Sequence, residues 1–268
     1  MFLDNFSVLI AFFVVFSPEM LYNFSMKTLV DFHTHTIASG HHTTDTLTTL
    51  AEEAAKRGLK CLGVTDHAPK MPGAASESYF MNLKYCDKKL YGVKILYGAE
   101  LNVLNKAGEV DLPCEILKTL DYSIASLHKD VIRPAGEKLD TEAILNVMKN
   151  SFVNIIGHPD DPTFSVNFEA ITDEAKKTGT ILEFNAVGVS PEGYRKKNVE
   201  GLIEMLLLCK RKGVFVSLGS DSHGKNRIAE FENCYKVLKD ISFPEELVLN
   251  DKPEVFLELV AAKKSQKI

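Results

Sequence analysis

The sequence predicts an α/β fold of the TIM-like barrel type, in which parallel strands alternate with helices. Three observations predict it. The chain has 268 residues, a length at which α/β barrels commonly form one domain. Short apolar runs alternate with longer helical patterns from residue 28 onward. Histidines and acidic residues gather where the apolar runs end, and the C-terminal ends of the strands carry the active site in such barrels.

Seven apolar runs are predicted to be strands. Most are unbroken and rich in β-branched residues, as expected for parallel strands covered on both faces. They are residues 28–32, 61–65, 94–97, 122–125, 153–156, 179–184 and 214–218. Seven βα units with right-handed crossovers favour a closed or nearly closed barrel.

Helices are predicted between these strands and after the last one. They cover residues 46–57, 76–91, 113–120, 141–150, 168–177, 199–212, 228–240 and 253–264. Asp45 is a candidate cap for the first helix, and Gly58 and Gly213 are expected to end two of them. Because no linker or repeat interrupts the pattern, residues 26–268 are predicted to form a single domain.

The first 25 residues differ from the rest of the chain. Residues 6–16 are apolar, too few to span a bilayer comfortably, and no Lys or Arg precedes them as in a signal peptide. Met26 then opens a segment that leads directly into the first predicted strand. The preferred interpretation is a non-domain extension from a mis-assigned start, with a membrane or export segment and a structural helix as alternatives.

Charge and cysteine content narrow the function classes. The formal net charge is −5, so the chain lacks the basic footprint of a nucleic-acid-binding protein. A bound metal cluster would add local positive charge, so an anionic substrate stays open. The five cysteines are widely spaced without a CxxC pair, which indicates free thiols in a reducing compartment and predicts a cytoplasmic protein.

The first predicted strand ends in the motif His33-Thr34-His35. Residues two apart on a strand point to the same face, so one metal ion can take both imidazoles. His41 and His42 lie on the following loop, which can fold back over the strand ends. One of them is a candidate ligand, and these residues alone do not decide which.

Polar residues also end the second and third predicted strands. His67 is a candidate ligand, whereas Asp66 is expected to orient a histidine or a bound water, or to relay a proton. Glu100 follows two small residues. A carboxylate inside a barrel is costly to desolvate unless it is paired or bound to metal, and its two oxygens can bridge two ions.

The later strands repeat this arrangement. His128 and His158 follow the fourth and fifth predicted strands, and Asp221 and His223 follow the seventh. Glu183 and Asn185 end the sixth and can line the same site, but they rank below the others.

Nine candidate ligands are too many for one ion and suit three, since a catalytic metal takes three or four protein ligands. They are His33, His35, one of His41 and His42, His67, Glu100, His128, His158, Asp221 and His223. Imidazole and carboxylate donors without thiolate suit zinc, manganese or iron. Closely spaced divalent ions activate a bridging water and clamp phosphoryl oxygens, so hydrolysis of phosphate esters is the leading chemistry.

These motifs together resemble the PHP (polymerase and histidinol phosphatase) superfamily, and most closely its stand-alone YcdX-type phosphatases. The resemblance covers about residues 28–265 and rests on the runs at 30–36, 63–67, 98–100, 157–159 and 219–223. It implies a distorted (β/α)7 barrel with a trinuclear metal centre. Zinc is the preferred metal for this centre, and manganese or iron is the alternative. The implied reaction is hydrolysis of a small phosphomonoester by a metal-bridging hydroxide.

The resemblance also implies which residue binds which ion. His33, His35, Glu100 and Asp221 would hold the first ion, and Glu100 would bridge to the second, held also by His128 and His158. His41, His67 and His223 would hold the third, which selects His41 over His42. Lys129 and Arg133, just past His128, are candidate phosphate contacts.

Several alternatives stay open. A histidinol-phosphate phosphatase or a PHP-type nuclease would keep the fold and change the substrate. An amidohydrolase-like hydrolase would also use an HxH motif, although it usually bridges its metals with lysine where this chain has Glu100. A non-catalytic metal-binding module would bind ions without turnover.

Overall fold

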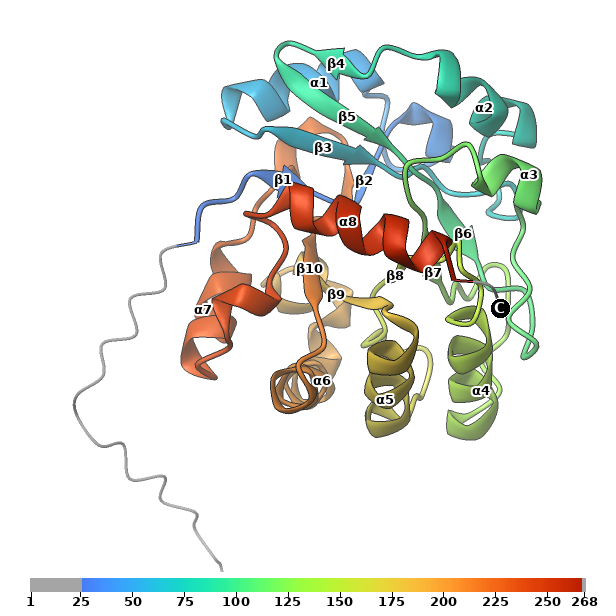
Figure 1. Cartoon of the computed structure of the whole chain (residues 1–268), viewed down its shortest axis with the longest axis vertical. Coiled ribbons are helices and arrows are strands. Elements are labelled where there is room, and N and C mark those ends of the chain that lie inside the picture. The colour runs from blue at the N-terminus through green and yellow to red at the C-terminus, as the bar shows by residue number, and fades with distance from the viewer. Residues whose placement is uncertain (1–25, 267–268) are drawn as a thin grey trace, which may run out of the picture.

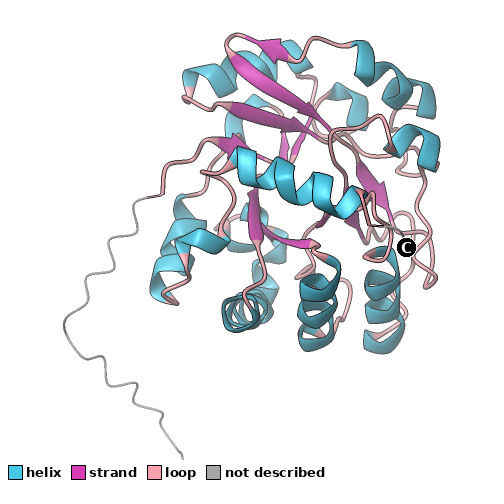
Figure 2. Ribbon diagram, viewed as in Figure 1, coloured by secondary structure: helices cyan, strands magenta, loops and turns pink. Residues whose placement is uncertain are grey.

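The computed structural model describes residues 26–266, and the interpretations of residues 1–25 lie outside the described part. All seven predicted strands are present, and no end differs from its prediction by more than two residues. They are β1 (Val30–Asp31), β3 (Cys61–Val64), β5 (Val93–Tyr97), β7 (Ile124–Ser126), β8 (Ile155–Ile156), β9 (Ile181–Asn185) and β10 (Val216–Gly219). The strands lie inside a layer of helices (Figure 2).

The strands pair in parallel with one exception. One sheet has the order β1-β3-β5-β4 and another the order β10-β9-β8-β7-β6. A third pairs β11 (Ser222–His223) with β2 (Thr34–His35). Only β4 (Lys89–Leu90) is antiparallel to its neighbour among the paired strands of the described chain. The pairings therefore give an α/β fold with parallel sheets, but they do not confirm one closed ring.

Three chain segments contribute a strand on each side of a break. β1 continues into β2 across Phe32 and His33, β5 continues into β6 (Glu100–Asn102), and β10 continues into β11. After each break the segment changes partner: β5 pairs with β3, whereas β6 pairs with β7. The breaks fall at the predicted ligands, so the backbone bends where the site is built.

Asn250 links the two outer strands β1 and β10. Its side-chain Nδ2 donates to the carbonyls of Val30 and Leu218, each at 2.9 Å, and its Oδ1 accepts the Leu218 N–H at 2.7 Å. A buried amide thus supplies the hydrogen bonds that a strand ladder would otherwise make between these edges.

Most predicted helices are present. They are α1 (Leu47–Lys56), α2 (Glu77–Asn82), α3 (Cys114–Leu117), α4 (Glu137–Val147), α5 (Phe168–Thr178), α6 (Val199–Lys212), α7 (Glu232–Asp240) and α8 (Pro253–Lys264). Figure 1 shows α4, α5 and α6 in a row beside the strands, with α8 passing across them. Thr46, not Asp45, caps α1, accepting from the Thr49 N–H.

The prediction of one helix over residues 76–91 was wrong. α2 ends at Asn82, and β4 then pairs with β5 through Lys89–Lys94 and Leu90–Val93. The two residues between these strands, Tyr91 and Gly92, have φ of 49° and 83°. A two-residue turn with positive φ matches the twist of a hairpin, and it overrides the helical pattern.

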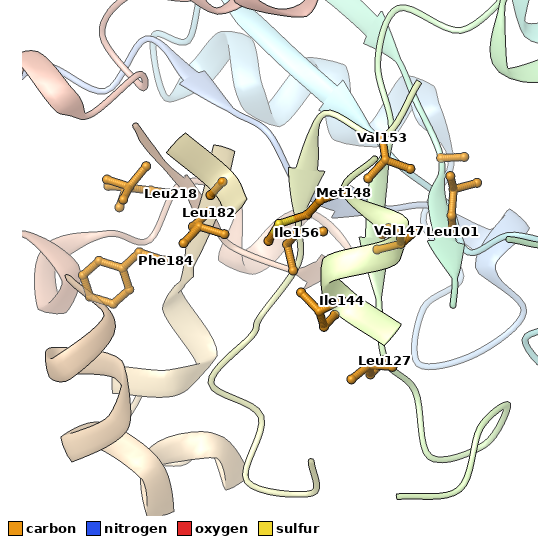
Figure 3. Close-up of a cluster of buried hydrophobic side chains, with 14 of the residues drawn as sticks. Leu101, Leu127, Ile144, Val147, Met148, Val153, Ile156, Leu182, Phe184 and Leu218 are labelled. Carbon is orange, nitrogen blue, oxygen red and sulfur yellow. The ribbon is translucent and has the colours of Figure 1, made fainter. Parts of the chain in front are cut away.

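Two apolar clusters hold the strands and helices together. We call the cluster that contains Phe32, Leu96 and Phe256 the inner cluster. The outer cluster contains Ile95 and Tyr97, the neighbours of Leu96 on β5. The outer cluster packs strands against helices, with α4 residues against Leu101 and Ile156 (Figure 3). In the inner cluster, Phe256 of α8 packs on Phe32 with ring centroids 4.2 Å apart. α8 therefore covers the inner cluster and leaves the other strand ends to the site.

Among the described helices, none has both the length and the apolar character that crossing a membrane would need.

Candidate metal centre

The predicted ligands converge because they follow neighbouring parallel strands. His35 lies in β2, Glu100 opens β6 and His223 lies in β11, while His67, His128 and His158 follow β3, β7 and β8. A backbone bridge pairs His67 with Glu100. His158 and Asp221 have φ of 29° and 52°, so both side chains are aimed from a backbone conformation that L-residues rarely adopt.

Glu100 lies at the centre of the cluster and is fully buried. Its Oε2 is 2.7 Å from His67 Nδ1, 3.3 Å from His33 Nε2 and 3.5 Å from His35 Nε2. Its Oε1 is 2.9 Å from His158 Nε2 and 3.1 Å from His128 Nε2. Each oxygen thus faces a different group of histidines, which is the arrangement that a bridging carboxylate needs.

Asp221 adds a second carboxylate beside the first group. Its Oδ1 is 3.2 Å from His35 Nε2 and 3.7 Å from His33 Nε2. Its Oδ2 accepts from Arg195 Nη1 at 2.9 Å and from Asn185 Nδ2 at 3.3 Å. One oxygen is therefore tied to the protein, and the other is directed at the histidines.

A third group forms at the mouth of the site. Ligand atoms of His35, His67 and His223 lie within 4.8 Å of one another. The His41 ring stacks on those of His67 and His223, with both centroid distances 4.9 Å. His42 is exposed and meets His223 edge-on at 5.9 Å. The loop thus presents His41 to this group more closely than His42.

Hydrogen bonds on the outer side of the rings orient the histidines. His33 Nδ1 donates to Glu183 Oε1 at 2.7 Å, and His128 Nδ1 donates to Asn102 Oδ1 at 2.7 Å. The amide nitrogen of Asn102 is committed to Asp111 and the Ala68 carbonyl, so its oxygen must accept. Donation through Nδ1 leaves the Nε2 lone pair facing inward, as in histidine ligands of metals.

The inward-facing atoms fit a set of cations. Within the described chain, buried His33 Nε2, His35 Nε2, His67 Nδ1, His223 Nε2 and Glu100 Oε2 have no hydrogen-bond partner. Buried polar atoms are normally paired, and lone pairs that face one another cannot pair without a proton or a metal ion. Nitrogen and carboxylate donors suit zinc, manganese or iron.

The electrostatics of Glu100 and His35 point the same way. Burial alone would raise the pKa of Glu100, but the surrounding His128, His33 and His67 hold it well below its usual value. Burial together with His223 and His67 lowers the pKa of His35 well below its usual value. A charged carboxylate beside a neutral imidazole is the protonation state in which both groups bind metal.

A pocket of about 570 Å³ opens onto the cluster. Its lining includes His41, Lys129 and Arg195, with Met71 and Pro72 on the apolar part. Of the two predicted phosphate contacts, Lys129 lines the pocket, whereas Arg133 is exposed and is not among its lining residues. The opening is large enough for a small organic phosphate beside the ions.

The structure brings all nine predicted ligand side chains into one cluster, and their role as ligands stays a prediction. Asp66 lies behind the cluster with its carboxylate hydrogen-bonded to protein groups. Sequence reasoning ranked Glu183 too low, and it missed Asn102, Ser39 and Arg195. A polar side chain ending the sixth strand was the available signal for Glu183, whereas Arg195 lies in the 3-10 helix η4 (Tyr194–Asn198), where nothing marks it.

Comparisons with known proteins point to one protein family. The PHP domain family matches residues 31–190. A probable phosphatase of Clostridium novyi is 42% identical over 89% of this chain and 96% of its own length. A probable phosphatase of Acetivibrio thermocellus is 39% identical over 90% of this chain and 98% of its own.

A solved structure shares the fold. It is the histidinol phosphate phosphatase of Lactococcus lactis, complexed with zinc, L-histidinol and phosphate. The TM-score is 0.57, with 20% identity over 81% of this chain and 95% of that one.

Proposed function

Because the chain belongs to the PHP domain family, we propose that it is a metal-dependent phosphatase that hydrolyses a small-molecule phosphomonoester. The observation that supports the proposal is the position of the Glu100 carboxylate, whose two oxygens face separate groups of histidines. Such a carboxylate could hold two divalent ions close together, as in two-metal phosphoryl-transfer sites.

The proposed cofactor is a set of three divalent ions. Zinc is the preferred metal, and manganese and iron are the alternatives. His33, His35, Glu100 and Asp221 would hold the first ion. His128 and His158 would share Glu100 at the second, and His41, His67 and His223 would hold the third. The zinc in the Lactococcus lactis phosphatase supports this choice of metal. When bound, such ions activate a water molecule and neutralise charge on the phosphoryl oxygens.

The chain's own residues supply orientation and the substrate wall. Glu183 and Asn102 fix the tautomers of His33 and His128. Arg195 holds one oxygen of Asp221, so the other faces the cluster. Lys129 lines the pocket, where its ammonium can meet an anionic substrate.

The strands are proposed to form a distorted seven-stranded barrel, since β2–β11 and Asn250 join the ends of the two larger sheets. Residues 26–268 are proposed to be one domain. The protein is proposed to act in the cytoplasm on a small phosphorylated compound, without a nucleic-acid partner.

The test measures metal content per chain and hydrolysis of an aryl phosphate and of histidinol phosphate on one preparation. We expect close to three ions per chain and turnover. His33→Ala should lower turnover at least about 100-fold, because loss of even an outer partner of a metal ligand can cost that much. His42→Ala, on the exposed neighbouring loop, is the control and should keep both properties. Fully metallated protein without phosphatase activity would refute the proposal.

A further inference from the structure

Asp66 has no acceptor capacity left for a reacting proton. It is 1% exposed. Its Oδ1 accepts the Thr36 backbone N–H and the Ser39 hydroxyl, each at 2.7 Å. Its Oδ2 accepts the Thr36 hydroxyl at 2.8 Å and the Tyr79 hydroxyl at 2.6 Å. A carboxylate offers about four lone-pair sites, and protein donors occupy four here.

Ser39 is committed in the same way. Its hydroxyl donates to Asp66 and accepts the His67 N–H at 3.1 Å. A hydroxyl has one proton and two lone pairs, so its remaining contact, with His35 Nδ1 at 2.9 Å, must also be an acceptance. His35 therefore carries its proton on Nδ1, and its Nε2 lone pair faces Glu100 and Asp221.

We propose that Asp66 is a positioning residue that acts through Ser39 to fix the tautomer of His35. Without the carboxylate, the Ser39 hydroxyl would be free to turn its proton toward Nδ1. His35 would then place an N–H where the cluster needs a lone pair. The inference rests on the part of the proposed function that makes His35 a metal ligand.

This role predicts that asparagine can replace Asp66. The Thr36 N–H always donates, so the new amide nitrogen cannot occupy the Oδ1 position beside it. The nitrogen must take the Oδ2 position, where the hydroxyls of Thr36 and Tyr79 can turn to accept. The amide oxygen then keeps the bond to Ser39, so Asp66→Asn preserves the tautomer of His35 but cannot take up a proton.

The experiment measures zinc affinity, turnover of an aryl phosphate and the imidazole ¹⁵N shifts of zinc-free protein in the wild type and four variants. A fifth variant, His35→Gln, serves only for assignment, because the signal missing from its spectrum is that of His35. Asp66→Asn should keep the Nδ1–H tautomer and lose less than about tenfold in zinc affinity and turnover. Ser39→Ala and Asp66→Ala should lose about 10- to 100-fold in zinc affinity and leave the tautomer mixed. Tyr79→Phe, which removes one bond to the other oxygen, is the matched control and should bind zinc like the wild type.

Two results would overturn the inference. A proton relay would lower turnover of Asp66→Asn by about 10²- to 10⁴-fold with zinc affinity unchanged. Ser39→Ala that binds zinc like the wild type with the tautomer unchanged would show that no positioning occurs, and this variant carries the test if Asp66→Ala does not fold. Because zinc affinity and ¹⁵N shifts need no turnover, they remain readable if the wild type hydrolyses no phosphate ester.

Discussion

At the scale of single residues, hydrogen bonds from neighbouring side chains determine the orientation of the candidate histidine ligands. Glu183 acts on two candidate ligands, because its Oε1 accepts from His33 Nδ1 and its Oε2 accepts the backbone N–H of His158 at 2.8 Å. Gly219 makes room for this carboxylate, since a Cβ at that position would lie 1.9 Å from Glu183 Oε1. One acidic side chain thus holds two candidate ligands in place.

Glu183→Gln should therefore behave unlike Asp66→Asn. Oε2 of Glu183 faces two obligatory donors, because it accepts the backbone N–H of His158 and also Asn185 Nδ2 at 3.0 Å. The amide nitrogen of glutamine must therefore take the place of Oε1, where it forces the His33 imidazole to accept at Nδ1 and to turn an N–H into the cluster. We expect zinc affinity to fall about 10- to 100-fold in a chelator competition. Affinity equal to that of the wild type would contradict this account.

The sequence could predict the nine candidate ligands, because histidine and acidic residues recur at the ends of parallel strands that must meet. It could not predict the residues that orient them. Asn102 and Ser39 are ordinary polar residues in sequence, and their roles depend on which atoms of Asp111 and Asp66 reach them. Arg195 reaches Asp221 from 26 residues away, a contact that no local pattern encodes.

At the scale of elements, apolar runs predicted the strands well because burial on both faces dictates their composition. The partner changes after β1, β5 and β10 were not predicted, since they follow from bends that the polar cluster imposes. α8 was predicted from its helical pattern, but its place across the inner cluster was not. Two lysines near the end of α8 bond to the rest of the fold. One of them is Lys264, whose Nζ donates to the Leu120 and Asp121 carbonyls at 2.7 and 2.9 Å.

The other lysine, Lys263, should make stability depend on pH. It is 2% exposed, its Nζ donates to the Met148 carbonyl at 2.9 Å and to the Thr180 hydroxyl, and burial lowers its pKa to about 7. Between about pH 7 and its ordinary value of 10.5, the unfolded chain binds this proton and the folded chain does not. Unfolding therefore becomes less favourable as the pH rises through this window, by at most about 1.4 kcal/mol per pH unit.

Lys263→Met should remove that slope. Lost hydrogen bonds shift the free energy of unfolding by a constant, so the difference between wild type and variant should change with pH only through the lysine. Urea unfolding at several values between pH 7 and 9 measures it. Lys239→Met on the exposed face of α7 is the control and should run parallel to the wild type. A Lys263→Met difference that does not vary with pH would mean that Lys263 stays protonated in the fold.

At the scale of the whole molecule, the candidate metal centre lies where the two larger sheets meet. The sheet of β1, β3 and β5 is followed by His33 and His67, whereas the sheet of β6 to β10 is followed by His128, His158 and Asp221. Glu100 opens β6 and touches histidines from both. Cations bound here would tie together strands that share few backbone hydrogen bonds, so the site should contribute to global stability as well as to chemistry.

Metal removal should therefore destabilise the entire domain. A ligand that binds only the folded chain adds about 4 kcal/mol to the free energy of unfolding at a free concentration 1,000 times its Kd. We expect the melting temperature of zinc-loaded protein to fall clearly when a chelator strips the ions, as a single cooperative transition followed by calorimetry. His33→Ala should lose most of that zinc-dependent difference, because its imidazole faces both carboxylates of the cluster. His42→Ala should keep the difference, since its ring lies outside the buried groups. Equal melting temperatures with and without bound zinc would mean that the ions bind the unfolded chain equally well. That result would contradict the expectation that bound ions stabilise the fold by connecting the two sheets.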